Sequence, residues 1–162
     1  MCTRAYLARL QGEAVKAQQL AQEGLKTSRE LQVTNTDLLT ELGHLALESG
    51  DLQTAISYWR EGFQYLIHTR SKTFWEGYVD AFALLAAQQG RSELAARLFG
   101  TRWCRGLYNM LAPFERTART AVLAEVQSKL GEERFTQLSQ EGQSMTFMQM
   151  LETVQEYLGV CE

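Results

Sequence analysis

A glycine that recurs at intervals of 38 and 40 residues constrains the fold of this chain more than any other feature of its sequence. Each such glycine is followed by a small residue five positions later and by an apolar residue nine positions later. A helix that ends on a glycine in the left-handed conformation can turn directly into a second, antiparallel helix that crosses close to it. The sequence therefore predicts helical hairpins. The three sets are Gly12, Ala17 and Ala21; Gly50, Ala55 and Trp59; and Gly90, Ala95 and Phe99.

Composition agrees with an all-helical chain. The 162 residues include a single proline and are rich in alanine, leucine, glutamine and glutamate, which lose little side-chain freedom in a helix. Start signals are predicted at Thr34 with Asp37 and at Thr73 with Glu76, where a hydroxyl and a carboxylate can cap a helix, and Asp51 and Ser92 follow their glycines as further caps. The predicted helices of the hairpins cover 3–11, 13–31, 37–49, 52–68, 74–89 and 92–110.

The last third of the chain departs from the repeat. Pro113 opens a helix that Gly131 ends, a shorter helix from Glu132 to Glu141 stops at Gly142, and Thr146 with Gln149 opens a last helix that stops before Gly159. Such a segment is typical of the cap that covers the end of a repeat array. We therefore expect one domain over 1–162, with helix-pair repeats in 1–110 and a three-helix cap in 111–162.

Part of the repeat resembles a known family. The stretch Gly43-His-Leu-Ala-Leu-Glu-Ser-Gly-Asp51, with Ala55 after it, is similar to the core of a tetratricopeptide repeat, and 82–90 with Ala95 matches less completely because Ala83 replaces the usual glycine. The family's closing proline is absent and the repeats are longer than usual. The resemblance implies an all-α, right-handed tetratricopeptide-like solenoid of helical hairpins.

The C-terminal half carries a second resemblance. Four blocks, at 95–100, at Pro113 with Glu115-Arg116, at 130–135 and at 141–146, are similar to the end of the helical-repeat region in bacterial signal-transduction ATPase regulators, which include LuxR-type and antibiotic-regulatory-type transcription factors. The resemblance implies a regulatory arm that binds ligands or partner proteins. The sequence contains neither a phosphate-binding Gly-x-x-x-x-Gly-Lys-Ser/Thr loop nor a basic helix-turn-helix pattern.

Charge and cysteine content narrow the class of function. A net charge of −3 gives no electrostatic footprint for nucleic acid, and we interpret the arginines around 97–119 as a solvated face. The cysteines are three and widely spaced, so neither a disulfide framework nor a zinc site is indicated. No signal peptide or membrane-spanning run is present, and we expect a cytoplasmic protein without metal or cofactor.

The tetratricopeptide resemblance also suggests which residues bind a partner. In that family the first helix of each pair lines a concave groove, and at the matching positions this chain has polar or partly apolar side chains that can alternatively be ordinary surface or packing residues. Trp75 and Tyr78 are the better candidates for exposed anchors, whereas Trp59 and Phe99 have the repeat phase of core residues. The candidate groove residues are Asp37, Thr40, His44 and Glu48, then Asp80, Leu84 and Gln88.

Three functions remain open at this point. The first is a protein-interaction module, a free-standing adaptor included; the second is a small-molecule sensor with a closed apolar pocket lined by Trp75, Tyr78 and Leu84; the third is an enzyme of unrecognised type. His44 and His68 lack a catalytic signature, and Glu132-Glu133 is interpreted as helix capping, so we expect no enzyme activity. The first hairpin has no cap of its own, which predicts that it can pair with a second copy.

Overall fold

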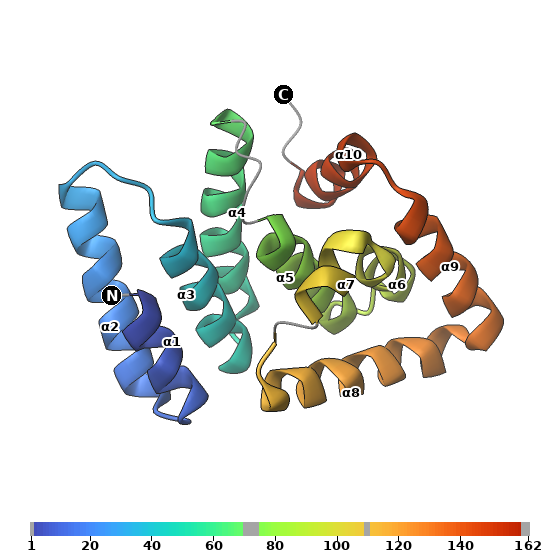
Figure 1. The fold of residues 1–162 in the computed structure, drawn as a ribbon, viewed down its shortest axis with the longest axis horizontal. Helices are drawn as coiled ribbons and strands as arrows, with labels where there is room; N and C mark the ends of the chain where they lie inside the picture. Colours follow the sequence, from blue (N-terminus) through green and yellow to red (C-terminus); the bar gives the residue numbers. More distant parts are fainter. Residues whose placement is uncertain (1, 70–74, 109–110, 160–162) are drawn as a thin grey trace. The chain divides into compact units, whose positions relative to one another are not determined.

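The computed structural model describes residues 2–69, 75–108 and 111–159, and these form ten α-helices and no strand (Figure 1). The prediction of an all-α protein is thus confirmed. Backbone contacts divide the chain into two compact units, 1–74 and 75–162. This division leaves the predicted boundary between repeats and cap at 110 and 111 untested. None of the described helices combines the length and the apolar character that a membrane span requires.

The first unit consists of two antiparallel helical hairpins (Figure 1). Helix α1 (Cys2–Leu10) pairs with α2 (Ala14–Glu30), and α3 (Thr36–Glu48) pairs with α4 (Leu52–His68). Helix α3 also packs against both α1 and α2. The second hairpin therefore stacks on the first along α3.

The second unit begins with a third hairpin, α5 (Trp75–Gln88) and α6 (Ser92–Gly100). The short helix α7 (Arg102–Tyr108) packs against both of them. Helix α8 (Pro113–Leu130) and helix α9 (Glu132–Ser144) both contact α6, and α10 (Phe147–Leu158) follows α9 (Figure 1). Helix α6 is thus the central element of this unit.

The same backbone hydrogen bonds close the turn of each hairpin. Gly12, Gly50 and Gly90 all have positive φ, and each donates its N–H to the carbonyl three residues before it. The residue after each glycine donates to the carbonyl five residues before itself, namely that of Ala8, Ala46 or Ala86. This pair of bonds is the Schellman motif, which satisfies carbonyls that the helix end would otherwise leave unpaired. The predicted hairpin turns are confirmed at all three glycines.

Close helix contacts in both units depend on residues without a side chain. In the first unit Trp59 is buried against Gly43, where a β-carbon would collide with the indole, and its Nε1 donates a hydrogen bond to the Thr40 carbonyl at 3.2 Å. In the second unit α6 and α9 approach so closely that a β-carbon at Gly100 or Gly142 would collide with the backbone of the opposite helix. These glycines set the spacing of the helix pairs.

Several predicted helix ends differ from the structure. The cap of α3 is Asn35, whose side chain accepts from the Leu38 N–H at 3.1 Å, and not Thr34. Arg91, without a side-chain hydrogen bond, occupies the cap position predicted for Ser92. The predicted Thr73 cap lies outside the described residues, whereas the caps at Asp51 and Thr146 are confirmed.

Two helices were predicted with the wrong length. The single helix expected over 92–110 is broken at Thr101, which has an extended conformation between α6 and α7. Helix α9 passes through Gly142 and ends at Ser144, because this glycine serves the close approach of α9 to Arg97 on α6 and not a turn. Pro113, Gly131 and Gly159 open or end their helices as predicted.

Candidate functional site

The four candidate residues of the first unit lie along one side of α3. Their spacing of three and four residues places them on successive turns of the same helix face. Asp37 is exposed, and partial burial of its carboxyl raises its pKa. Thr40 donates its hydroxyl to the carbonyl of Thr36 at 2.9 Å, so its side chain is already used within the helix.

The other two candidates on α3 contact neighbouring helices. The ring of His44 packs edge-on against Trp59 of α4, with 5.3 Å between the ring centroids. Glu48 accepts from Arg9 Nη1 of α1 at 2.8 Å, and Arg9 also donates to the buried carboxylate of Glu41 at 2.6 Å. The α3 face is thus partly occupied by contacts that hold the first unit together.

Most of the candidate residues on α5 belong to the core. Trp75 and Tyr78 are only 3% and 1% exposed, so the prediction of exposed anchors is wrong. The ring of Trp75 packs edge-on against Phe147 of α10 at 4.9 Å, and Tyr78 lies near Phe82 at 6.4 Å. The contact of Trp75 with Phe147 could not be seen in the local pattern, because the two residues are 72 positions apart in sequence.

Asp80 is buried and forms an ion pair with Arg119 of α8, whose guanidinium also lies over the ring of Phe99 at 4.7 Å. Burial lowers the pKa of Arg119 to about 10, which leaves the guanidinium charged at neutral pH. Asp80 therefore connects α5 to α8. The remaining α5 candidates are more accessible, since Leu84 is partly buried and Gln88 is exposed.

The arginines around 97–119 do not form one solvated face. Arg102, Arg105 and Arg116 are exposed, as predicted. Arg119 is buried, and the half-buried Arg97 pairs with Glu141, so the prediction is wrong for these two.

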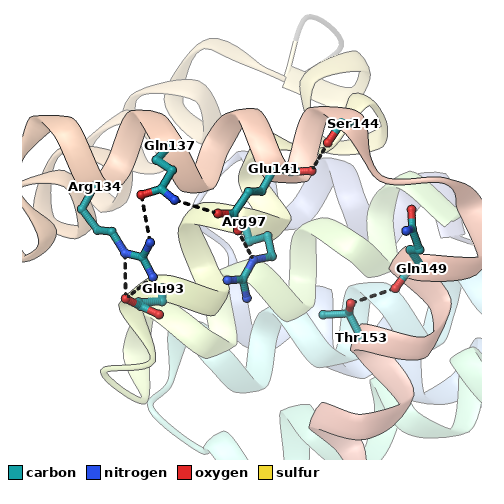
Figure 2. Close-up of polar contacts among 8 residues, drawn as sticks. All are labelled: Glu93, Arg97, Arg134, Gln137, Glu141, Ser144, Gln149 and Thr153. Carbon is teal, nitrogen blue, oxygen red and sulfur yellow. Dashed lines mark hydrogen bonds and ion pairs between the residues drawn. The ribbon is translucent and has the colours of Figure 1, made fainter.

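An open groove of about 460 Å³ lies in the second unit and was not predicted from the sequence. It is bordered by α6, the C-terminal half of α9 and the exposed side of α10, and Figure 2 shows several of its side chains. We call it the carboxylate groove, because three glutamates and a single arginine line it. The lining residues are Arg97, Glu141, Ser144, Met145, Gln149, Glu152, Thr153 and Glu156.

One wall of the carboxylate groove is held by a polar network between α6 and α9 (Figure 2). Arg97 Nε donates to Glu141 Oε2 at 3.1 Å, and Gln137 Nε2 donates to the other oxygen of Glu141 at 3.2 Å. Farther along α9, Arg134 donates to Gln137 at 3.0 Å and to Glu93 of α6 at 2.8 and 2.9 Å. The carboxylate of Glu141 and the only guanidinium of the groove are therefore already engaged with each other.

The opposite wall, on α10, carries carboxylates that have no such partner. Glu152 and Glu156 are exposed and one helical turn apart, and neither forms an ion pair with another described residue. Thr153 lies between them and donates its hydroxyl to the Gln149 carbonyl at 2.8 Å. The groove thus presents two available negative charges beside its open space.

Local sequence patterns do not predict this groove. Arg97 and Glu141 are 44 residues apart, and each belongs to a helix with an unremarkable solvent-facing pattern. The only usable signal was the pair of glutamates one turn apart on the last helix. That spacing is ordinary for an exposed helix face, so it does not by itself indicate a site.

The described residues contain no group of three histidine, cysteine, aspartate or glutamate side chains placed to hold a metal ion. His44 and His68 lie on different helices of the first unit. The chain matches no protein-family model, no curated protein and no solved structure. Its function is therefore inferred from the geometry of its own residues.

Proposed function

We propose that this protein is a protein-binding module whose carboxylate groove holds a partner segment carrying lysine or arginine side chains. The observation that carries the proposal is the pair of available carboxylates, Glu152 and Glu156, beside an open space of about 460 Å³. A cationic side chain in this groove would gain charge-assisted hydrogen bonds without displacing the guanidinium of Arg97. Complementary charge also raises the rate at which the correct partner is captured.

The open, polar character of the groove favours a protein segment over a small apolar ligand. A small-molecule sensor was expected to have a closed pocket lined by Trp75, Tyr78 and Leu84, but the first two side chains pack into the core of their unit. Small-molecule sites are mostly apolar and enclose most of their ligand. The interaction module is therefore the better-supported alternative, and it requires no catalytic residue, metal or cofactor.

A narrower form of the proposal follows from the family resemblances. The three hairpins would form a right-handed tetratricopeptide-like solenoid, and the chain would be the regulatory arm of a cytoplasmic bacterial transcriptional regulator or a free-standing adaptor. The identical Schellman turns support the solenoid, because repeat arrays reuse one supersecondary unit. In this form the exposed α3 residues Asp37 and Glu48 would provide a second contact surface.

The proposal is tested by binding of labelled peptides to the full chain. Fluorescence anisotropy would compare an alanine-lysine and an alanine-arginine peptide with an alanine-glutamate peptide of equal length. Both cationic peptides are expected to bind. The double variant Glu152→Gln, Glu156→Gln should weaken their affinity roughly threefold to tenfold, the range for two exposed charge pairs. Higher salt should weaken the affinity further.

Matched variants separate the groove from general charge effects. Glu132→Gln with Glu133→Gln removes the same charge from the first turn of α9, outside the groove lining, and should leave affinity unchanged. The double variant Asp37→Asn, Glu48→Gln removes the same charge from α3. If the α9 variant weakened peptide binding as much as the groove variant, the effect would come from net charge and not from the groove. If only the α3 variant weakened it, the binding surface would lie on the first unit.

A further inference from the structure

A straight row of side chains follows the exposed face of α10 along the carboxylate groove. Met148, Glu152 and Glu156 are spaced by four residues, so they lie on successive turns of the same side of the helix. Both glutamates line the groove, and Met148 precedes Glu152 by one turn. The row is therefore the accessible edge of the groove on α10. The opposite, buried face of this helix is formed by Met150, Val154 and Leu158.

This row is apolar at one end and acidic at the other. Met148 is 57% exposed, although the next two members of the row are carboxylates that face solvent. Met145, three residues before Met148, lines the groove and is only partly buried. Flexible thioether side chains adapt to apolar partners of different shape. The groove thus offers an apolar contact and two negative charges in a fixed order.

A capping box holds the apolar end of the row in place. The Thr146 N–H donates to Gln149 Oε1 at 2.9 Å, and the Gln149 N–H donates to the Thr146 hydroxyl oxygen at 3.3 Å. This pair of bonds fixes the first turn of α10, which carries Met148. The row therefore has its helical spacing before a partner binds, which reduces the entropy lost on binding.

The spacing of the row matches that of another helix. Side chains four residues apart in a helix recur about every 6 Å along its axis. A partner helix with three contact residues at i, i+4 and i+8 repeats this interval, so all three contacts can form in one register. Same-face residues of an extended segment recur about every 6.8 Å, and their alignment with the row is lost along its length. The row therefore favours a helical partner.

We propose that the occupant of the carboxylate groove is an amphipathic helix that presents one apolar and two cationic residues on successive turns of the same face. This inference rests on the proposed function and specifies the partner of the same site. The apolar residue packs against Met148, while the two cations pair with Glu152 and Glu156. The charge pairs accelerate capture of the partner, and the apolar contact adds affinity that salt does not screen.

The test uses alanine-rich peptides of equal length that bind to the full chain. The aligned peptide has leucine, lysine and lysine at i, i+4 and i+8, and it is made in both sequence orders because a partner helix can run in either direction. The displaced peptide has the leucine moved to i+2, on the opposite face of its helix. The broken peptide is the aligned one with a proline between the two lysines, which disrupts the helix.

Fluorescence anisotropy would compare these peptides on the wild type, on Met148→Gln and on Val33→Gln. Val33 is the matched control, because it is also 57% exposed but lies in the first unit. The wild type should bind the better of the two aligned peptides roughly threefold to tenfold more tightly than the displaced peptide, the effect of partly burying one apolar side chain. The broken peptide should also bind at least about threefold more weakly than the aligned one, because it must order its backbone on binding.

Met148→Gln should make the affinities for the aligned and displaced peptides equal, whereas Val33→Gln should preserve their difference. The inference is overturned if the wild type binds both peptides equally, if Met148→Gln leaves their difference unchanged, or if the broken peptide binds as tightly as the aligned one. In each of these cases cationic peptides still bind and the proposed function stands. If no cationic peptide binds at all, the proposed function fails together with the inference.

Discussion

The guanidinium of Arg119 on α8 forms an ion pair with the carboxylate of Asp80 on α5, and both side chains are almost completely buried. A charge in such a place depends on its partner, because removal of one member leaves the other desolvated and uncompensated. The pair therefore links α8 to the third hairpin, and its two members depend on each other.

Asp80→Asn is expected to reduce the free energy of unfolding by about 3–5 kcal/mol, since Arg119 would remain charged and buried without a counter-ion. Urea unfolding at neutral pH measures this loss. The control is Glu93→Gln, which removes the exposed ion pair with Arg134 and should cost at most about 1 kcal/mol. Similar losses in the two variants would contradict the role assigned to burial.

Gly142→Ala should destabilise the second unit by about 1–3 kcal/mol, the usual effect of inserting a methyl group into a closely packed contact. The new β-carbon would collide with the carbonyl of Arg97 and force α6 and α9 apart. Gly106→Ala is the matched control, because Gly106 lies in α7 with open space around its β-position. That change should be neutral or slightly stabilising, as alanine favours a helix more than glycine does.

Because the thiol of Cys104 is buried, we expect the protein to lose stability in alkaline solution. Complete burial raises the pKa of its thiol from an ordinary value of 9.0 to about 12. Below pH 9 the thiol is protonated in both states; above it the unfolded chain loses the proton while the folded chain keeps it. The contribution of this thiol to the free energy of unfolding therefore falls between pH 9 and 12, by at most about 1.4 kcal/mol per pH unit.

Urea unfolding of the wild type and Cys104→Ala at pH 8.5, 9.5 and 10.5 tests this prediction. Any advantage of the wild type should shrink as the pH rises, because the variant lacks the titrating thiol. Tyr157→Phe is a useful comparison, since burial raises the pKa of Tyr157 from 10.0 to about 12 and its effect should begin only near pH 10. A difference between wild type and Cys104→Ala that stays constant with pH would contradict the assignment.

The features that the sequence predicted correctly are those determined by neighbouring residues. The turns at Gly12, Gly50 and Gly90 close through hydrogen bonds that span at most five residues, so the glycine and the helix before it carry the whole signal. The same holds for the cap at Thr146, which depends on Gln149 three residues later. The sequence therefore predicts which segments are helical and where most of the helices end.

The features that escaped prediction depend on residues far apart in the chain. The tetratricopeptide resemblance implies that Asp80 is a groove residue, but Arg119, 39 residues away in sequence, pairs with it in the core. Gly142 was interpreted as a helix end, since nothing in its own segment reveals the backbone of Arg97 beside it. The carboxylate groove combines three helices, and no local pattern encodes their convergence.

The Schellman turns also bear on how quickly this protein can fold. Each hairpin is closed by contacts between residues that are close in sequence, so its formation requires little loop-closure entropy. Chains dominated by such local contacts have low contact order and fold rapidly. Folding can therefore start at any of the three turn glycines, and a slow step is expected only where the long connections through α8 and α9 must find α6.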